Sequence, residues 1–276
     1  MSSITVRHLK FDFEQGKDFN PEVIQGEYEM ACFMVGLSMI LPYLEPYLMR
    51  HSLAGQKIVK DSVLRQDMRQ FSQQQAQHCR QHALFNASVR KKYPQLELLE
   101  KQVEADYQRF SKRGLKFNLA FAQGFESLSA AWAIFMWNSG MIGSMRGPFA
   151  DIAAWHFLEE VEHRSVAHDA YRHLYGGYGY RVWVSLIAQS HLIAFMLACT
   201  RLMLRAEREK FQGRGGWSAR LTRIWQWTRV GAKHLFPQLG KTYLPGYDPR
   251  QLAVPPAWAG LAEKYNARAD KLITSF

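Results

Sequence analysis

Hydrophobic positions recur along this chain at helical spacing, three and four residues apart, while the alternation typical of strands is nearly absent. Proline and glycine divide the pattern into segments. They predict six long helices over about 21–41, 55–90, 95–112, 115–140, 149–174 and 180–210. Pro42 is expected to end the first helix, and a Gly-rich turn at 213–216 to follow the last one.

The 276 residues are enough for one large helical domain with its own core. We expect residues 1–20 to form an N-terminal extension and residues 21–210 to form the helical bundle. Residues 211–276 are then a basic, Trp-containing C-terminal extension that packs on the bundle. Three scattered cysteines predict no disulfide framework, and the N-terminus shows no signal-peptide pattern, so a cytoplasmic location is expected.

Two apolar stretches differ from the rest of the chain. Residues 182–200 contain no Lys, Arg, Asp or Glu and are long enough to cross a bilayer. Polar residues 189–191 lie at their centre, however, and the mean hydropathy of the chain is −0.28. A helix buried inside a bundle is also apolar all round, and we favour that interpretation over a membrane span. The second stretch, 117–145, holds Glu126 as its one acid, which is costly to bury unless it is paired or metal-bound.

The segment 155–164 reads Trp-His-Phe-Leu-Glu-Glu-Val-Glu-His-Arg and carries the strongest chemical signal. On a helix, His156, Glu160 and His163 fall within one narrow stripe, with Glu159 at its edge. Imidazoles and carboxylates on one helical face make a metal site. The Glu160-x-x-His163 step is also the one that dinuclear iron and manganese helix bundles use.

Other predicted helices offer matching ligands. His78 and His82 are four residues apart and share a face, and Gln75 stands one turn earlier, where a carboxylate would complete a second Glu-x-x-His step. Glu27 opens the first helix and is weak evidence alone, because an acid there also complements the helix dipole.

Glu27, His78, Glu126 and His163 are separated by 51, 48 and 37 residues, intervals that suit successive antiparallel helices. The sequence therefore predicts an all-α fold, a ferritin-like four-helix bundle with additional C-terminal helices. The expected metal ligands are Glu27, His78, His82, Glu126, His156, Glu160 and His163.

These motifs resemble the ferritin-like family labelled predicted metal-dependent hydrolase. The matching residues are Gly26-Glu27, Ala76-x-His78-x-x-x-His82, Glu126, Trp155-His156-x-x-Glu159-Glu160-x-Glu162-His163-Arg164-x-Val166-Ala167 and Tyr243-Leu-Pro-Gly-Tyr-Asp-Pro249. The resemblance covers about residues 20–250. Three positions depart from the family pattern: Gln75 stands for a Glu, and Ser127 and Asp248 each stand for a His. We interpret the site as a His-rich dinuclear centre, with a single-metal site as the alternative.

Two reaction classes fit this centre. The resemblance to dinuclear iron bundles implies two Fe ions, O₂ and an external electron donor, hence an oxygenase or hydroxylase. Trp132, Phe135, Met136, Trp137 and Phe149 would then enclose a hydrophobic, lipid-like or terpenoid-like substrate, including a thioester-linked one. With Zn or Mn, the alternative is hydrolysis of an ester or thioester, with Glu159 as catalytic general base. A non-enzymatic, membrane-peripheral metal-binding protein is the third interpretation.

Charge is concentrated in the last quarter of the chain. Residues 201–276 contain 14 Lys/Arg and 5 Asp/Glu, which places +9 of the net +11 there, together with Trp217, Trp225 and Trp227. We expect this region to contact an anionic membrane surface or an acidic carrier of the substrate. No nucleic-acid-binding motif accompanies the charge. The sequence leaves the oligomeric state open, with a dimer as one arrangement.

Overall fold

The computed structural model describes residues 4–13, 19–211 and 217–273. These residues form an all-α helical bundle, as the periodicity predicted, and their one β feature is an isolated bridge between Ile24 and Met145. The bounds are α1 Tyr28–Gln56, α2 Ser62–Lys92, α3 Leu96–Ser111, α4 Leu115–Asn138, α5 Met141–Ser144, α6 Gly147–Glu162, α7 Val166–Leu174, α8 Tyr178–Ala206, α9 Arg208–Phe211, α10 Trp217–His234, α11 Phe236–Thr242 and α12 Trp258–Ile273. The expected turn at 213–216 lies outside the described residues.

Helix α1 continues through the proline that was expected to end it. Pro42 has no N–H to donate to the carbonyl of Ser38, and Pro46 leaves the carbonyl of Pro42 without its helical partner. Side chains of α2 supply both missing bonds, since Asn86 Nδ2 donates to Ser38 O at 2.8 Å and Cys79 Sγ to Pro42 O at 3.8 Å. The predicted end at residue 41 is therefore wrong, because a neighbouring helix satisfies the carbonyls that proline frees.

The predicted fifth helix is two helices, α6 and α7. His163 is the C-cap of α6, with φ −96° and ψ 7°, and the chain turns before α7 begins at Val166. The His163 amide still donates to Glu159 O at 3.1 Å, so helical geometry extends through His163 itself. Glu160 and His163 consequently keep the common face that their spacing predicted, despite the break that follows.

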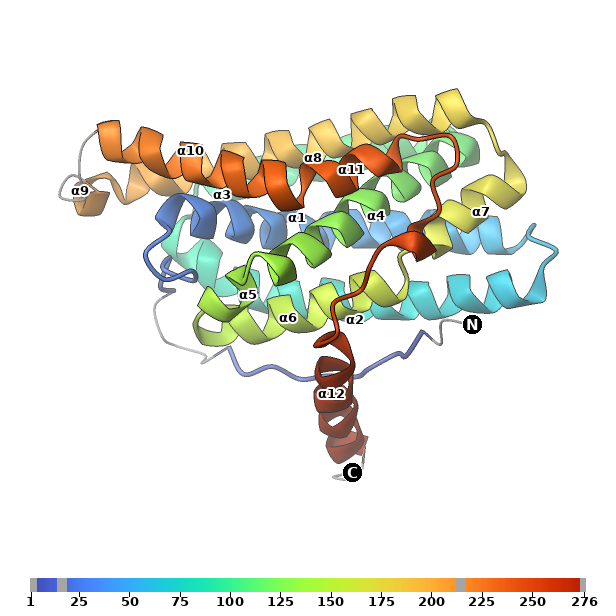
Figure 1. Cartoon of the computed structure of the whole chain (residues 1–276), viewed down its shortest axis with the longest axis horizontal. Helices are drawn as coiled ribbons and strands as arrows, with labels where there is room; N and C mark the ends of the chain where they lie inside the picture. Colours follow the sequence, from blue (N-terminus) through green and yellow to red (C-terminus); the bar gives the residue numbers. More distant parts are fainter. Residues whose placement is uncertain (1–3, 14–18, 212–216, 274–276) are drawn as a thin grey trace.

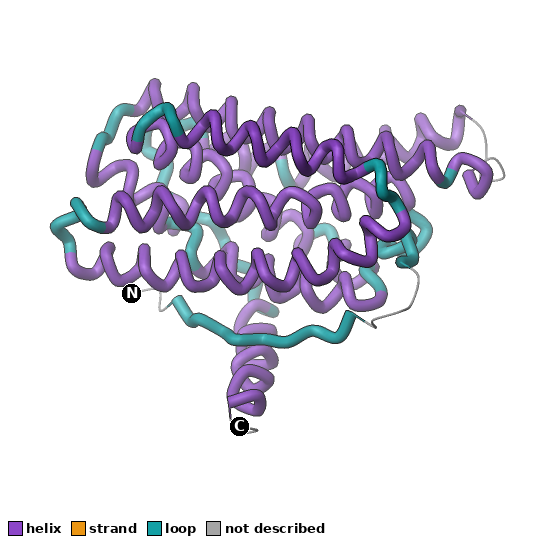
Figure 2. Tube along the Cα trace, turned by 180° about the vertical axis from the view of Figure 1, so that it is seen from behind, coloured by secondary structure: helices purple, strands orange, loops and turns teal. Residues whose placement is uncertain are grey.

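The bundle packs α1 against α2 and α8, and α4 against α8, α7 and α6, as Figures 1 and 2 show from opposite sides. Helix α4 is buried on all sides from Phe117 to Met136. It approaches α8 very closely at Gly124, where an added Cβ would lie 2.5 Å from Ser185 Cα. The central position of α4 places the carboxylate of Glu126 in the interior of the bundle.

The N-terminal segment, residues 4–13, lies extended along the bundle near α2, α6 and α12 (Figure 1). Three glutamines of α2 hold it: Gln70, Gln74 and Gln81 donate to the carbonyls of Ile4, Thr5 and Leu9 at 3.0, 2.9 and 2.9 Å. Ile4 and Leu9 are each 3% exposed. The segment is thus part of the core, and it carries Arg7 toward the buried acids of α6.

Candidate metal centre

Two groups of three buried side chains meet in the middle of the bundle. The first is Glu45, His78 and His156, and the second is Glu126, Glu160 and His163. Within each group one potential ligand atom per residue lies within 4.8 Å of the other two. The six residues come from α1, α2, α4 and α6 with its C-cap, and none is more than 3% exposed. The four ligand-bearing helices therefore converge on one site.

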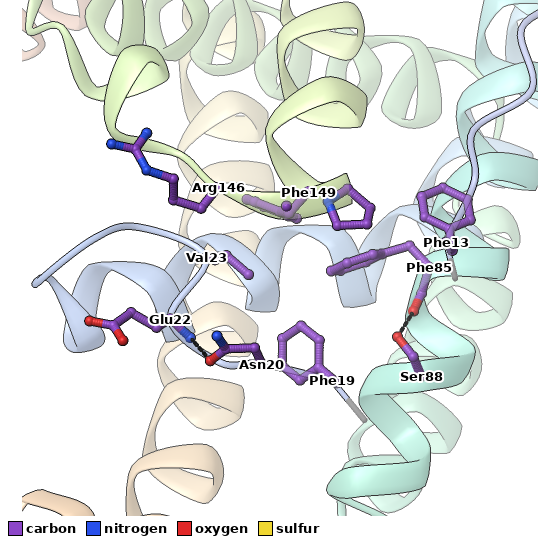
Figure 3. Close-up of a pocket in the computed structure, with 11 residues that line it drawn as sticks. Phe13, Phe19, Asn20, Glu22, Val23, Phe85, Ser88, Arg146 and Phe149 are labelled. Carbon is purple, nitrogen blue, oxygen red and sulfur yellow. Dashed lines mark hydrogen bonds between the residues drawn. The ribbon is translucent and has the colours of Figure 1, made fainter. Parts of the chain in front are cut away.

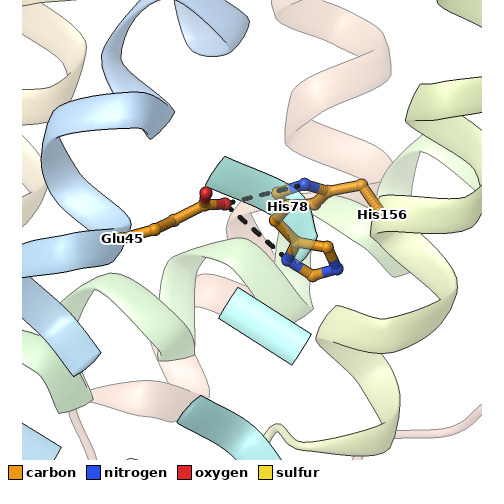
Figure 4. A group of neighbouring side chains, drawn as sticks. All are labelled: Glu45, His78 and His156. Carbon is orange, nitrogen blue, oxygen red and sulfur yellow. Dashed lines mark ion pairs between the residues drawn. The ribbon is translucent and has the colours of Figure 1, made fainter. Parts of the chain in front are cut away.

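In the first group, the Glu45 carboxylate faces two imidazoles (Figure 4). Its Oε1 lies 3.7 Å from His78 Nδ1 and 3.9 Å from His156 Nδ1. The two imidazole rings stack with their centroids 4.1 Å apart. These separations leave the carboxylate and both rings around a common space and too far apart for good direct hydrogen bonds.

In the second group, His163 Nε2 lies 3.2 Å from Glu126 Oε2 and 3.4 Å from Glu160 Oε1. The same Glu160 oxygen is 3.1 Å from His156 Nε2 and 3.8 Å from His78 Nδ1. Glu160 therefore faces the histidines of both groups. Glu160 would therefore be available to a metal ion held by either group.

The polar atoms at this site lack the partners that burial demands. Within the described residues, several buried atoms have no hydrogen bond: both oxygens of Glu45 and of Glu160, Glu126 Oε2, Gln75 Oε1, His78 Nδ1 and His163 Nε2. Ion pairs join some of these atoms, but leaving so many buried polar atoms without a hydrogen bond would be costly, and metal ions would satisfy them together. The donor set of carboxylates and imidazoles is the one that Fe, Mn and Zn accept. The residues present thus fit a metal pair.

Three groups at the site have pKa values shifted from their ordinary ranges. Burial raises the pKa of Glu45 well above its usual range and that of Glu126 to about 8. Burial lowers the pKa of His163, but the Glu160 and Glu126 carboxylates outweigh it and raise that pKa to about 10. At neutral pH Glu126 and His163 therefore hold protons. Metal binding has to displace those protons, so the affinity for metal rises with pH.

Each group has one histidine that is oriented from behind. His78 Nε2 lies 3.0 Å from Glu159 Oε2, which leaves Nδ1 facing the site. His163 Nδ1 lies 2.8 Å from Gln74 Oε1, which leaves Nε2 facing the site. Hydrogen bonds of this kind fix the tautomer and the ring direction of metal-binding histidines. The His78 ring is held through Nε2, whereas the His163 ring is held through Nδ1.

Arg7 of the N-terminal segment connects both of these outer contacts. Its Nη1 donates to Glu159 Oε1 at 3.1 Å and to Glu162 Oε2 at 2.9 Å, and its Nη2 donates to Glu162 Oε1 at 2.7 Å. Gln74 Nε2 in turn donates to Glu162 Oε2 at 3.0 Å. One buried guanidinium, 1% exposed, thus supports His78 through Glu159, and His163 through Glu162 and Gln74.

The structure brings together five of the seven predicted ligands: His78, Glu126, His156, Glu160 and His163. The sixth, His82, is buried directly behind them. Its Nδ1 lies 2.8 Å from Ser38 Oγ and its Nε2 lies 3.0 Å from His156 Nδ1. His82 is thus placed to orient His156, and it is not one of the six residues of the two groups.

The seventh predicted ligand, Glu27, lies away from the site. It is the N-cap residue of α1, half-buried at the bundle end, and accepts a hydrogen bond from Trp227 Nε1 at 3.0 Å. Glu45 lies 18 residues further along the same helix, about 27 Å at 1.5 Å per residue. The expectation for Glu27 is therefore corrected, and Glu45 is the α1 carboxylate at the centre. Its signal was a lone acid in an apolar segment, 40–48, which the proline rule wrongly excluded from the first helix.

Glu159 was expected to act as a general base in the hydrolytic alternative. Its Oε1 accepts hydrogen bonds from Arg7 and from Trp155 Nε1, and its Oε2 faces His78. Burial raises the pKa of Glu159 to about 7, although Arg7 and Trp155 oppose that rise. With both oxygens engaged, Glu159 is placed to hold His78 and does not offer a free carboxylate to a water molecule.

Gln75 occupies the position where a fourth carboxylate would complete the set. It is fully buried one turn before His78, and its Nε2 donates to Glu126 Oε1 at 3.2 Å. Three carboxylates, Glu45, Glu126 and Glu160, thus face the site, and they would balance three of the four charges of two divalent ions.

Replacing Gln75 by glutamate is expected to tighten the binding of the second metal ion by roughly tenfold or more, because the site gains a negative charge at close range. Calorimetric titration of the metal-free protein with Fe²⁺ or Mn²⁺ measures the change. Gln73→Glu, at an exposed position of the same helix, is the matched control and should bind as the wild type does. Equal affinities in the three proteins would place Gln75 outside the metal site.

A cavity of about 300 Å³ lies between the N-terminal region, α2 and the start of α6. Phe13, Phe19, Phe85 and Phe149 turn their rings toward it (Figure 3). Phe85 is one turn from His82 on α2, and the Phe85 and Phe149 rings lie 5.3 Å apart. Of the aromatic residues expected to enclose a pocket, Phe149 lines this cavity, whereas Trp132 packs against Phe33 in the core.

A protein-family model described as "Predicted metal-dependent hydrolase" matches residues 5–253. It confirms the resemblance that the motifs indicated. Neither the search of curated proteins nor that of solved structures found a match.

Proposed function

The chain belongs to the predicted metal-dependent hydrolase family, and we propose that it is a dinuclear iron enzyme that uses O₂ to oxidise a hydrophobic substrate. The observation that supports this most is the donor pattern on four helices. Glu45 comes from α1, Glu126 from α4 and Glu160-x-x-His163 from α6, with Gln75-x-x-His78 on α2. Except for Gln75, this is the arrangement of carboxylate-bridged iron and manganese bundles.

Bound iron would supply the activation of O₂, and the residues of this chain do the rest. Oxidation of R–H to R–OH by O₂ yields one water and consumes two electrons and two protons, so the proposal includes an external electron donor. Burial of the ligands, all at most 3% exposed, keeps bulk water away from a reactive oxidant. Glu159 fixes the orientation of the His78 ring, and Gln74 fixes that of the His163 ring, while the charge at the site changes.

The phenylalanine-lined cavity supports an apolar substrate. Its volume of about 300 Å³ is at the lower end of the range for small-molecule sites. Four phenylalanine rings offer dispersion and hydrophobic contacts, and the lining also includes the charged side chains of Glu22 and Arg146. Phe85 lies one turn from His82 on α2, and His82 contacts His156, so a lipid-like or terpenoid-like chain bound there would approach the centre from the His156 side.

Hydrolysis of an ester or thioester is the second candidate. Besides the family description, the charge at the site favours it. Three carboxylates leave two divalent ions with one uncompensated positive charge, which would favour a bound hydroxide, the nucleophile of metal-dependent hydrolysis. Against it, Glu159 has both oxygens engaged by Arg7, Trp155 and His78.

The two candidates are separated by loading the metal-free protein anaerobically with Fe²⁺, Mn²⁺ or Zn²⁺. For an oxygenase we expect two irons per chain, rapid O₂ uptake on mixing with aerated buffer, and an optical band of an oxo-bridged ferric pair. His163→Ala, loaded in the same way, should show neither the uptake nor the band. Hydrolysis of a p-nitrophenyl acyl ester without oxygen by the Zn²⁺ or Mn²⁺ form, with no O₂ uptake by the Fe²⁺ form, would instead establish the hydrolase.

A further inference from the structure

Helix α8 presents an uncharged apolar stripe to solvent. Trp183, Leu186 and Leu197 are 48, 48 and 47% exposed, and with Ser190 and Ala194 they repeat every three or four residues along one face. The stripe spans about four turns, roughly 21 Å. An exposed apolar face of this length marks a surface that another apolar phase covers.

The opposite face of α8 belongs to the bundle. Gln189 Nε2 donates to Gly124 O at 3.0 Å, and Ser185 Oγ to Gln123 Oε1 at 3.1 Å, which attaches the helix to α4. Arg181 is buried and donates to Thr242 O. α8 and α1 are each long and apolar enough to span a bilayer, yet most of the α1 window is buried and 44% of the α8 window is buried. These contacts allow α8 to lie on a membrane while its inner face stays packed.

Positive charges stand at both ends of the stripe. Near its N-terminal end, the Arg113 guanidinium lies 5.6 Å from the centre of the Trp183 ring, and Lys116 Nζ lies 4.7 Å from that of Tyr180. Beyond its C-terminal end, the exposed side chains of residues 201–209 are Arg201, Arg205, Ala206, Arg208 and Glu209, a net positive set. The acids near the helix, Asp106 and Glu207, form ion pairs with Arg109 and Lys92.

Helix α10 adds a second amphipathic face at the same edge of the molecule, which is the edge opposite α12 in Figures 1 and 2. Leu221, Ile224 and Trp225 are 47, 51 and 62% exposed and lie on one side of α10. Arg229 and Lys233, also exposed, follow them. Aromatic and aliphatic side chains beside cations are the composition of helices that lie in the plane of an anionic membrane.

We propose that the α8 and α10 faces dock this protein on an anionic lipid bilayer, with α8 lying in the plane of the interface. A second copy of the chain is a poorer occupant of the α8 stripe. Antiparallel pairing of two α8 helices would bring Arg113 of one copy to Arg201 of the other, and parallel pairing would place each cation on its own equivalent. Anionic headgroups instead complement the charge at both ends. Docking on a membrane through these faces does not depend on which reaction the metal centre carries out.

The test is cosedimentation of the metal-loaded protein with phosphatidylcholine vesicles, with and without phosphatidylglycerol. Binding is expected only with phosphatidylglycerol. It should weaken between about 0.1 M and about 1 M salt, as the Debye length falls from about 10 Å to about 3 Å. Equal binding to both vesicle types, or none to either, would overturn the proposal.

Paired variants locate the surface. Leu186→Glu with Leu197→Glu should lower the affinity for phosphatidylglycerol vesicles by about tenfold or more, because two apolar contacts are lost. The matched control is Leu84→Glu with Leu98→Glu, at leucines 47 and 73% exposed on α2 and α3, and it should bind as the wild type does. Arg201→Ala with Arg205→Ala leaves the apolar stripe unchanged and should reduce the salt dependence of binding to phosphatidylglycerol vesicles. Membrane docking is refuted if the Leu186→Glu, Leu197→Glu variant binds vesicles as the wild type does. It is also refuted if the wild type is a dimer and this variant is a monomer.

Discussion

Glu160→Ala is expected to abolish binding of both metal ions, the largest effect of any single substitution at the centre. One Glu160 oxygen lies within 3.8 Å of His78, His156 and His163, so both groups lose their shared carboxylate. The site would then keep only Glu45 and Glu126 to balance four positive charges. Metal content per chain after anaerobic loading, measured by plasma mass spectrometry, checks the result.

His82→Ala is the control for this variant. It also removes a buried polar side chain beside His156, but one whose nitrogens already contact Ser38 and His156. We expect it to retain both ions with weakened affinity at the His156 side. The far-ultraviolet circular dichroism of each metal-free variant shows whether it is folded. A folded Glu160→Ala protein that still holds two ions per chain would disprove the shared position of Glu160.

The buried His and Glu residues of α2, α4 and α6 that meet at the centre could be identified from the sequence because the signal is local. His156, Glu160 and His163 are related by steps of four and three residues on one helix, and such relations survive whatever the helix packs against. Even the break after His163 left the Glu160–His163 step intact. The helical class of the fold follows from the same periodicity. The helical class and the Glu160–His163 step both depend on residues that lie within about one turn of each other in the sequence.

The α1 ligand could not be placed in this way, since its helix depends on a distant contact. Pro42 ends an isolated helix because it frees the carbonyl of Ser38. Here Asn86, 48 residues away, donates to that carbonyl, and α1 continues to carry Glu45 into the site. A sequence rule that considers only the hydrogen bond lost at the proline ends the helix too early, and it leaves Glu27 as the acid chosen from the first helix. The error therefore lies in tertiary hydrogen bonding, which residue spacing does not reveal.

Arg7 was invisible to sequence reasoning for a similar reason. It lies in a segment without helical periodicity, and its partners Glu159 and Glu162 are 152 and 155 residues away. The α2 glutamines that hold the segment, among them Gln74, look like an ordinary solvated helix face in the sequence. In the structure they bind the backbone of residues 4–9, and Gln74 also contacts His163.

Arg7→Ala is expected to weaken metal binding by about 10–100-fold, the usual effect of removing a group that orients metal ligands. The loss leaves Glu159 and Glu162 without their cation, and the pKa of Glu159, already about 7, should rise further. A protonated Glu159 no longer holds His78 through a charged hydrogen bond. Loss of one partner from a buried ion pair also costs about 3–5 kcal/mol of unfolding free energy.

The control separates this effect from simple loosening of the N-terminal segment. Arg268 of α12 donates to Lys10 O at 2.7 Å and pairs with Asp151, so it holds the same segment without touching Glu159 or Glu162. Arg268→Ala should therefore lower the melting temperature while metal affinity stays close to wild type. Nitrogen chemical shifts of the histidine rings give the direct readout, since Arg7→Ala should change the tautomer balance of His78, and Arg268→Ala should not. If the two variants lose metal equally, Arg7 serves only to fasten the segment, and its role in orienting His78 and His163 is refuted.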